Sequence, residues 1–156
     1  MNFEQAHVLN EAIRAIGIRH RALAGALLAP LGLHTGQEVL LLELAEQGPR
    51  TQSQLAAASG CEPPTISNSV RKLEDAGLLV RRPSPTDQRA TIVELSERGK
   101  ELIPDLRAAW KQLADQTAAG LTSTSLGELT STVVDLAASL TAASTRVDEP
   151  PPPSTR

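Results

Sequence analysis

The hydrophobic pattern of the chain changes its period at Gly77, and this change constrains the fold more than any other feature. Upstream, Ile66, Val70 and Leu73 recur at the three- and four-residue steps of an amphipathic helix. Downstream, the runs 78–82 and 90–95 are apolar and rich in β-branched residues, and the turn formers PSPTDQR separate them. The sequence therefore predicts a helix followed at once by a β-hairpin with a long tip.

Helical periodicity and capping signals place the other elements. A first helix is predicted over about residues 6–28, and capping-box patterns at Thr35–Glu38 and Thr51–Gln54 predict the starts of two more. A long helix is predicted from Ser96, with Pro104 kinking it or marking a restart. A third capping box at Ser125–Glu128 opens the last helix. The predicted order is helix, helix, short helix, helix, β-hairpin, helix, helix.

A short helix, a tight turn, a longer helix and an adjoining hairpin are typical of a winged helix-turn-helix. The expected fold is mostly α with a small β-hairpin wing. We expect residues 33–96 to form the winged lobe, and residues 1–32 and 97–146 to form a helical dimerisation region. Residues 147–156 are proline-rich and polar, so they are predicted to be a disordered tail.

Composition excludes several other classes of protein. The chain has 156 residues and one cysteine, Cys61, which rules out an intramolecular disulfide and a multi-cysteine zinc site. Its three histidines have no acidic partners at matching spacing, so neither a metal nor a cofactor is expected. There is no glycine-rich phosphate loop and no recognisable catalytic arrangement, so an enzyme is not expected.

The sequence also indicates where the protein is located. No apolar run approaches the roughly 20 residues that span a bilayer, and the N-terminus has no basic segment followed by an apolar one. The expected location is the cytoplasm, with no membrane partner. The aromatic residues are Phe3 and Trp110, so Leu, Ala, Val and Ile must build the core.

The helix predicted over residues 64–76 has an outer face suited to reading DNA. Short hydrogen-bonding side chains lie near its N-terminal end and cations lie in its middle. That division suits a helix in the major groove, where short groups reach base edges and cations reach phosphates. An ordinary surface helix would also be polar outside, but the short helix before it and the hairpin after it favour DNA. The outer residues are Thr65, Ser67, Asn68, Arg71, Lys72 and Asp75.

The hairpin carries cations of its own. Arg81 and Arg82 lie where the first strand leaves the core, and Arg89 lies at the tip beside Asp87. An arginine on a loop tip can enter a minor groove, and a neighbouring carboxylate can hold its guanidinium extended. The alternative is a solvated turn pair that contributes almost nothing.

The run from Leu73 to Gly99, LEDAGLLVRRPSPTDQRATIVELSERG, resembles the MarR family of bacterial transcription regulators. Asp87 and Arg89 match an Asp-x-Arg pair at the wing tip, and Leu95-Ser96 with Gly99 match the start of the following helix. Helix order outside the lobe also agrees, so the resemblance covers about residues 6 to 145.

This resemblance implies a homodimer whose first and last two helices interlock, with two lobes reading a palindromic site. It implies that Ser67 and Asn68 contact bases and that Arg89 lies in the minor groove. The chain departs from the family at Pro63-Pro64, which weakens the case for backbone contacts there because prolines have no N–H donor. The residues expected to contact double-stranded DNA are Ser53, Thr65, Ser67, Asn68, Arg71, Lys72, Arg81, Arg82, Asp87 and Arg89.

The residues support a dimer separately. The first and last helices carry apolar stripes that the small lobe cannot cover, and Val133, Leu136 and Leu140 recur at helical steps in the last. Two copies would bury these stripes against each other. The expected function is a repressor that binds a palindromic operator as a homodimer and is modulated by a small aromatic ligand.

Three residues are candidates for a ligand pocket, because a tryptophan and two histidines suit an aromatic carboxylate. They are His20, His34 and Trp110. The alternative is that both histidines are surface caps and that Trp110 lies in the core of the dimer. Cys61 is interpreted as a small core residue at the turn of the motif, with a thiol-based redox sensor as the alternative. The rival to DNA binding is a winged-helix module for protein–protein interaction.

Overall fold

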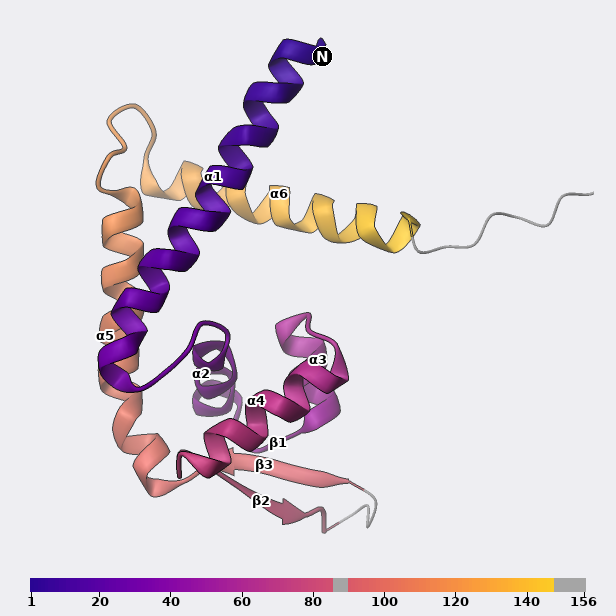
Figure 1. The fold of residues 1–156 in the computed structure, drawn as a ribbon, viewed down its shortest axis with the longest axis vertical. Coiled ribbons are helices and arrows are strands. Elements are labelled where there is room, and N and C mark those ends of the chain that lie inside the picture. The colour runs from indigo at the N-terminus through magenta and orange to yellow at the C-terminus, as the bar shows by residue number, and fades with distance from the viewer. Residues whose placement is uncertain (86–89, 148–156) are drawn as a thin grey trace, which may run out of the picture. The chain divides into compact units, whose positions relative to one another are not determined.

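The computed structural model describes residues 1–85 and 90–147, the side chains of 144–147 excepted (Figure 1). Asp87, Arg89 and residues 148–156 of the predicted tail lie outside this description. The chain divides into two compact units, Met1–Asp115 and Gln116–Arg156. The elements are α1 (Phe3–Leu28), the 3₁₀ helix η1 (Ala29–Leu31), α2 (Gln37–Gln47), β1 (Arg50–Thr51), α3 (Gln52–Ser59), α4 (Pro63–Asp75), β2 (Leu79–Pro83), β3 (Thr91–Leu95), α5 (Glu97–Ala118) and α6 (Leu126–Val147).

The predicted fold class is confirmed, because the described chain is mostly helical and has a small antiparallel sheet after α4. The wing has one more strand than the predicted hairpin. Strand β1 pairs with β3, so the strand order is β1-β3-β2 and β3 lies in the centre. Figure 1 shows α2, α3 and α4 gathered beside these three strands.

Capping side chains explain several of the helix starts. The Thr51–Gln54 box forms at the start of α3, and the Ser125–Glu128 box forms at the start of α6. Helix α1 begins earlier than predicted because Asn2 and Gln5 form a further capping box. Pro104 lies inside the continuous helix α5, so the predicted restart there does not occur.

The capping box predicted at Thr35–Glu38 is wrong. Gly36, with a φ of 98°, takes the N-cap position of α2, and no side chain caps the helix there. Instead the Glu38 carboxylate accepts a hydrogen bond of 2.6 Å from the Gly36 N–H, and the Gln37 side chain accepts one from the His34 N–H. The left-handed backbone at Gly36, which glycine tolerates, moves the start of α2 past Thr35, so the predicted capping box does not form.

The core of the first unit is built mainly from leucine, as the scarcity of aromatic residues requires. Helices α2, α3, α4 and α5 and the strands β2 and β3 all contribute side chains to it. Its fully buried members include Leu41, Leu55, Val70, Val93 and Leu106. This core fixes α3 against α4 and both against the wing, which places their outer faces relative to one another.

The first turn of α5 is joined tightly to the start of β2. The Ser96 hydroxyl donates a hydrogen bond of 2.6 Å to the Gly77 carbonyl and accepts one of 2.9 Å from the Gly99 N–H. The Ser96 N–H donates to the Leu78 carbonyl at 3.0 Å. Gly99 permits this approach, because a Cβ at that position would lie 2.1 Å from the Leu78 oxygen.

Candidate nucleic-acid interface

Helix α4 divides into a buried and an exposed face, as its sequence predicts. Ile66, Val70 and Leu73 are buried in the core. The helix ends at Asp75, and Gly77 then adopts a φ of 73°, the left-handed conformation that favours glycine after a helix. The outer face of α4 is therefore held rigidly and is open to solvent.

The polar side chains predicted to contact DNA are exposed in the structure wherever it describes them. Ser53 lies on α3, five of these residues lie on α4, and two lie on β2. This places Ser53, Thr65, Ser67, Asn68, Arg71, Lys72, Arg81 and Arg82 at the surface. Asp87 and Arg89, the predicted wing-tip pair, lie outside the described residues, and their roles stay predictions.

Part of this set converges on one shallow hollow of about 420 Å³. Ser67, Asn68 and Arg71 of α4 line it together with Arg81 of β2. Gln52, the first residue of α3, completes the lining, and sequence reasoning did not select it. The only signal for Gln52 was its place directly after the capping residue Thr51, which does not show that it faces α4.

Hydrogen bonds order the side chains around the hollow. The Ser67 hydroxyl donates to Gln52 Oε1 at 2.9 Å, which links α4 to α3. The Arg71 guanidinium donates to Asn68 Oδ1 at 3.0 Å within α4. Each short polar side chain thus already uses one hydrogen-bonding group on the protein side.

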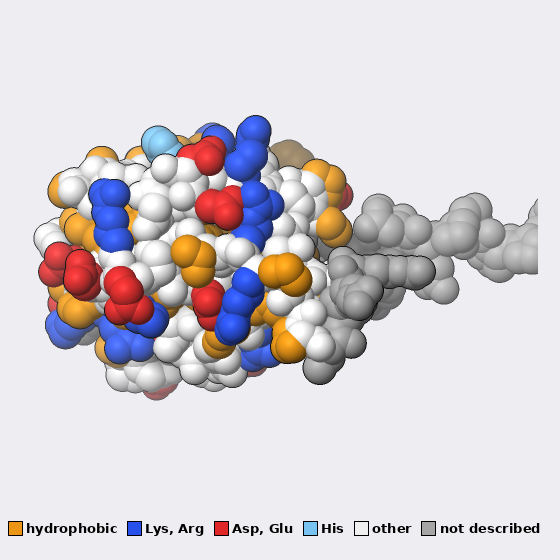
Figure 2. Space-filling view, turned by 90° about the horizontal axis from the view of Figure 1, so that it is seen from below, with side chains coloured by type: hydrophobic (Ala, Val, Ile, Leu, Met, Phe, Trp, Pro, Cys, Tyr) orange, Lys and Arg blue, Asp and Glu red, His pale blue; other side chains and the backbone are white. Residues whose placement is uncertain are grey.

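The two arginines of β2 are both paired with carboxylates. Arg81 forms an ion pair with Glu74 of α4, and Arg82 pairs across the sheet with Glu94 of β3 at 2.8 Å. The hydrogen bond that Arg81 donates to Glu74 raises the pKa of Arg81, an effect that slight burial opposes. Figure 2 shows the same mixture on the face seen from below, where Lys and Arg side chains lie beside Asp and Glu.

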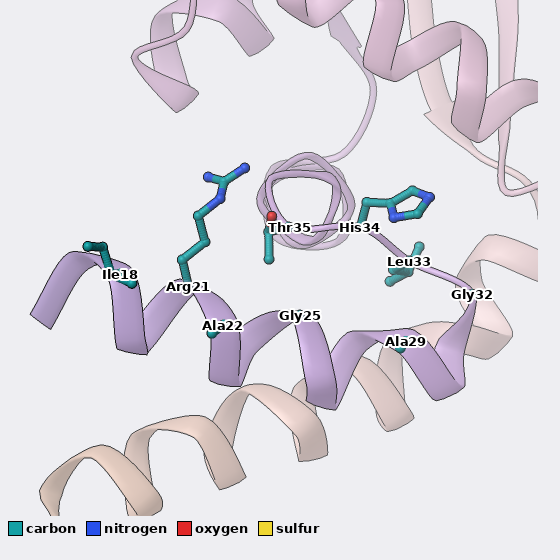
Figure 3. Close-up of a pocket in the computed structure, with 9 residues that line it drawn as sticks. All are labelled: Ile18, Arg21, Ala22, Gly25, Ala29, Gly32, Leu33, His34 and Thr35. Atoms are coloured by element: carbon teal, nitrogen blue, oxygen red, sulfur yellow. The ribbon is translucent and has the colours of Figure 1, made fainter. Parts of the chain in front are cut away.

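A second site is a cavity of about 750 Å³ between the C-terminal half of α1 and the start of α2. Ile18, Ala22 and Leu33 give it apolar walls, and Arg21 and His34 give it polar ones. Figure 3 shows Arg21, Thr35 and His34 on the same side of α1. The arrangement suits a small planar molecule that carries an acidic group.

The structure brings only part of the predicted ligand set to this cavity. His34 lines it, whereas His20 and Trp110 do not. Both of those side chains are exposed. Arg21, which was not among the residues predicted from the sequence, supplies the charge instead.

Cys61 is exposed, so its interpretation as a core residue is wrong. It lies after Gly60, which ends α3, and its thiol donates a weak hydrogen bond to the Ser59 carbonyl at 3.6 Å. Among the described residues, no group of His, Cys, Asp and Glu side chains is arranged to hold a metal ion. None of the described helices has the length and apolar character needed to cross a bilayer.

Comparisons with known proteins agree with this geometry. A family model, described as the MarR family, matches residues 33–91. A probable transcriptional regulator from Pseudomonas aeruginosa is 32% identical, and the match covers 85% of this chain and 96% of that one with a TM-score of 0.72. The chain belongs to the MarR family. The resemblance carried by Leu73–Gly99 is thereby confirmed, and this MarR-family protein is a DNA-binding transcription regulator.

Two more distant structures share the fold. BpsR of Bordetella bronchiseptica, solved to explain regulation of its DNA binding by 6-hydroxynicotinic acid, is 23% identical with a TM-score of 0.71; the match covers 82% of this chain and 95% of that one. A mutant of MarR from E. coli, complexed with operator DNA, is 19% identical with a TM-score of 0.76; that match covers 90% and 99%. The family comprises transcription regulators and not enzymes, which agrees with the expectation for this MarR-family chain.

Proposed function

We propose that this MarR-family regulator acts as a repressor that binds a palindromic operator as a homodimer and is modulated by a small aromatic acid. The observation that carries the proposal is the convergence of Ser67, Asn68, Arg71 and Arg81 on one exposed hollow beside α3. In this arrangement α4 enters the major groove with its short polar side chains toward base edges, and the arginines lie toward the backbone.

The apolar faces of the terminal helices support the homodimer. On α1, Val8 and Ile16 are each 64% exposed, and on α6, Val133 and Leu140 are each 55% exposed. Apolar side chains repeated along a helix favour burial against another surface. A second copy provides an identical pair of helices, and a two-fold axis would match a palindromic site.

DNA recognition is tested by selecting bound fragments from a genomic pool and then titrating salt. Binding of the selected duplex should weaken steeply as salt rises, whereas a winged-helix module for protein partners would not bind duplex DNA at all. Lys72→Gln should weaken binding and lower the salt slope by about one. Lys111→Gln on α5 is the control, because it also removes one exposed positive charge but lies outside the proposed interface. Equal effects of both changes would contradict the proposed docking of α4.

The homodimer is tested by sedimentation equilibrium of the full chain. A monomer at the concentrations that saturate the operator would contradict the proposal. The substitution Val133→Glu places a charge on the apolar face of α6 and should shift the equilibrium toward monomer, together with a loss of tight operator binding.

Ligand modulation rests on the cavity between α1 and α2. Arg21 and His34 line this cavity together with apolar side chains, which suits a carboxylate on an aromatic ring. In BpsR, 6-hydroxynicotinic acid regulates DNA binding, so that acid and a series of hydroxybenzoates are the first probes. An acid that releases the operator should lose its effect in Arg21→Gln and keep it in Arg19→Gln, since Arg19 does not line the cavity. Equal loss in both variants would contradict this site.

A further inference from the structure

The hydrogen bonds around the hollow fix which kind of base edge each reading side chain can recognise. We propose that Gln52 is a positioning residue that makes Ser67 a hydrogen-bond acceptor toward DNA, so that Ser67 selects bases carrying an amino group. This inference rests on the proposed docking of α4 in the major groove. It concerns whether Ser67 donates or accepts a hydrogen bond toward DNA, which the position of Ser67 alone does not decide.

A serine hydroxyl has one proton to donate and two lone pairs that accept. In this structure the proton of Ser67 is directed to Gln52 Oε1 at 2.9 Å. What remains for a ligand on the open side is acceptor capacity. In the major groove the donors are the N6 amino group of adenine and the N4 amino group of cytosine, whereas guanine and thymine present acceptors.

Asn68 is set to the opposite polarity. Its side-chain oxygen accepts from the Arg71 guanidinium at 3.0 Å, and within the described residues no hydrogen bond occupies its amide nitrogen. That nitrogen is a donor, so it suits guanine O6 or N7, thymine O4 and adenine N7, but not the amino group of cytosine. Two adjacent residues of α4 would therefore read an amino-bearing base and a base other than cytosine at neighbouring positions.

Gln52 can hold Ser67 in this state because α3 is fixed against α4. Leu55 and Ala56 of α3 lie in the same buried cluster as Ile66 and Val70 of α4. The capping box at Thr51 orders the residue just before Gln52. The hydrogen bond is exposed to water in the free protein, and it would become stronger when the groove excludes water.

The experiment selects duplexes from a randomised pool with the full-length protein and four variants. Wild type should prefer A or C over G or T at one position in each half-site, by about five- to tenfold. Gln52→Met keeps the length of the side chain and removes the acceptor, so this preference should fall to about twofold or less. Gln52→Glu keeps an acceptor and should restore the preference, although the added charge weakens binding at every sequence.

Ser67→Ala identifies the position that Ser67 reads, and Gln52→Met combined with it should relax nothing further. The discrimination against cytosine opposite Asn68 is the internal control, and it should persist in both Gln52 variants. A purely structural role for Gln52 would lower affinity without changing the base preference. Two results would overturn the inference: an unchanged preference in Gln52→Met, or a keto-bearing base opposite Ser67 in wild type. A pool from which wild type enriches no sequence would instead overturn the proposed function.

Discussion

Replacing Gly99 with alanine should destabilise the winged lobe sharply, although alanine is the better helix former. The added Cβ would lie 2.1 Å from the Leu78 oxygen and 3.1 Å from its carbonyl carbon. Real Cβ atoms essentially never come within 3.0 Å of another heavy atom, so α5 and β2 must move apart by about 0.9 Å. The obstacle is backbone, which cannot rotate away as a flexible side chain can.

The cost follows from what this separation breaks. The hydrogen bond from Ser96 N–H to the Leu78 oxygen, now 3.0 Å, would lengthen beyond bonding range. Its loss costs about 0.5–1.5 kcal/mol, and overpacking costs a further 1–3 kcal/mol or so. The free energy of unfolding should therefore fall by roughly 2–4 kcal/mol, equivalent to a fall in Tm of about 5–15 °C for a chain of this size.

Urea unfolding followed by far-UV circular dichroism measures this loss, at one protein concentration because association contributes to stability. The matched control is Gly127→Ala in the first turn of α6, where a Cβ meets no atom within 4 Å. There the higher helix propensity of alanine should leave the stability equal to or up to about 1 kcal/mol above that of wild type. A Gly99→Ala variant within about 0.5 kcal/mol of wild type would refute the close-approach argument.

Three further outcomes are expected. Glu74→Gln frees Arg81 from its ion pair and removes a charge that repels phosphate. Operator affinity, measured by fluorescence anisotropy, should therefore rise several-fold. Unchanged or weaker binding would contradict the idea that Glu74 competes with DNA for Arg81. Cys61→Ser should leave the free energies of unfolding and of DNA binding within about 0.5 kcal/mol of wild type, since the side chain is exposed. If peroxide releases wild type from DNA but leaves the variant bound, Cys61 is a thiol switch instead. Hydrogen bonds from Ser125 lower the pKa of Glu128 below its ordinary 4.5. The ionised Glu128 therefore stabilises the start of α6 fully at pH values well above 4.5, and this stabilisation is lost as the pH falls through the lowered pKa. Hydrogen exchange of the first amides of α6 should accelerate in acid relative to Glu128→Gln, and parallel behaviour of the two proteins would exclude this cap.

The recognition helix and the wing could be predicted because their signals are local. Ile66, Val70 and Leu73 mark one face at helical spacing, and Gly77 marks the stop, so both the buried side and the exposed side follow from 13 residues. Strand β1 could not be predicted. It has two residues, and its partners Val93 and Ile92 lie about forty positions away, so no local pattern reveals it.

The candidate sites show the same division. Ser67 and Asn68 were predicted from their place on one helix, whereas Gln52 joins them only because α3 packs on α4. The cavity beside α1 depends on how α1 meets the segment before α2, so no local pattern shows that Arg21 lines it and that Trp110 does not. Cys61 resembled a core residue by type, but its position after Gly60 carries it to the surface.

The sheet order β1-β3-β2 also determines how the protein avoids aggregation. A sheet with open edges offers unpaired backbone groups on which further strands can add. Here one edge, β1, has only two residues, and the other, β2, ends in Pro83, which has no N–H to donate. Arg81 and Arg82 place positive charge along that second edge. Charged side chains on an exposed edge disfavour the addition of further strands. We therefore expect that replacing both arginines with valine promotes self-association through β2, measured by sedimentation velocity, and also weakens DNA binding.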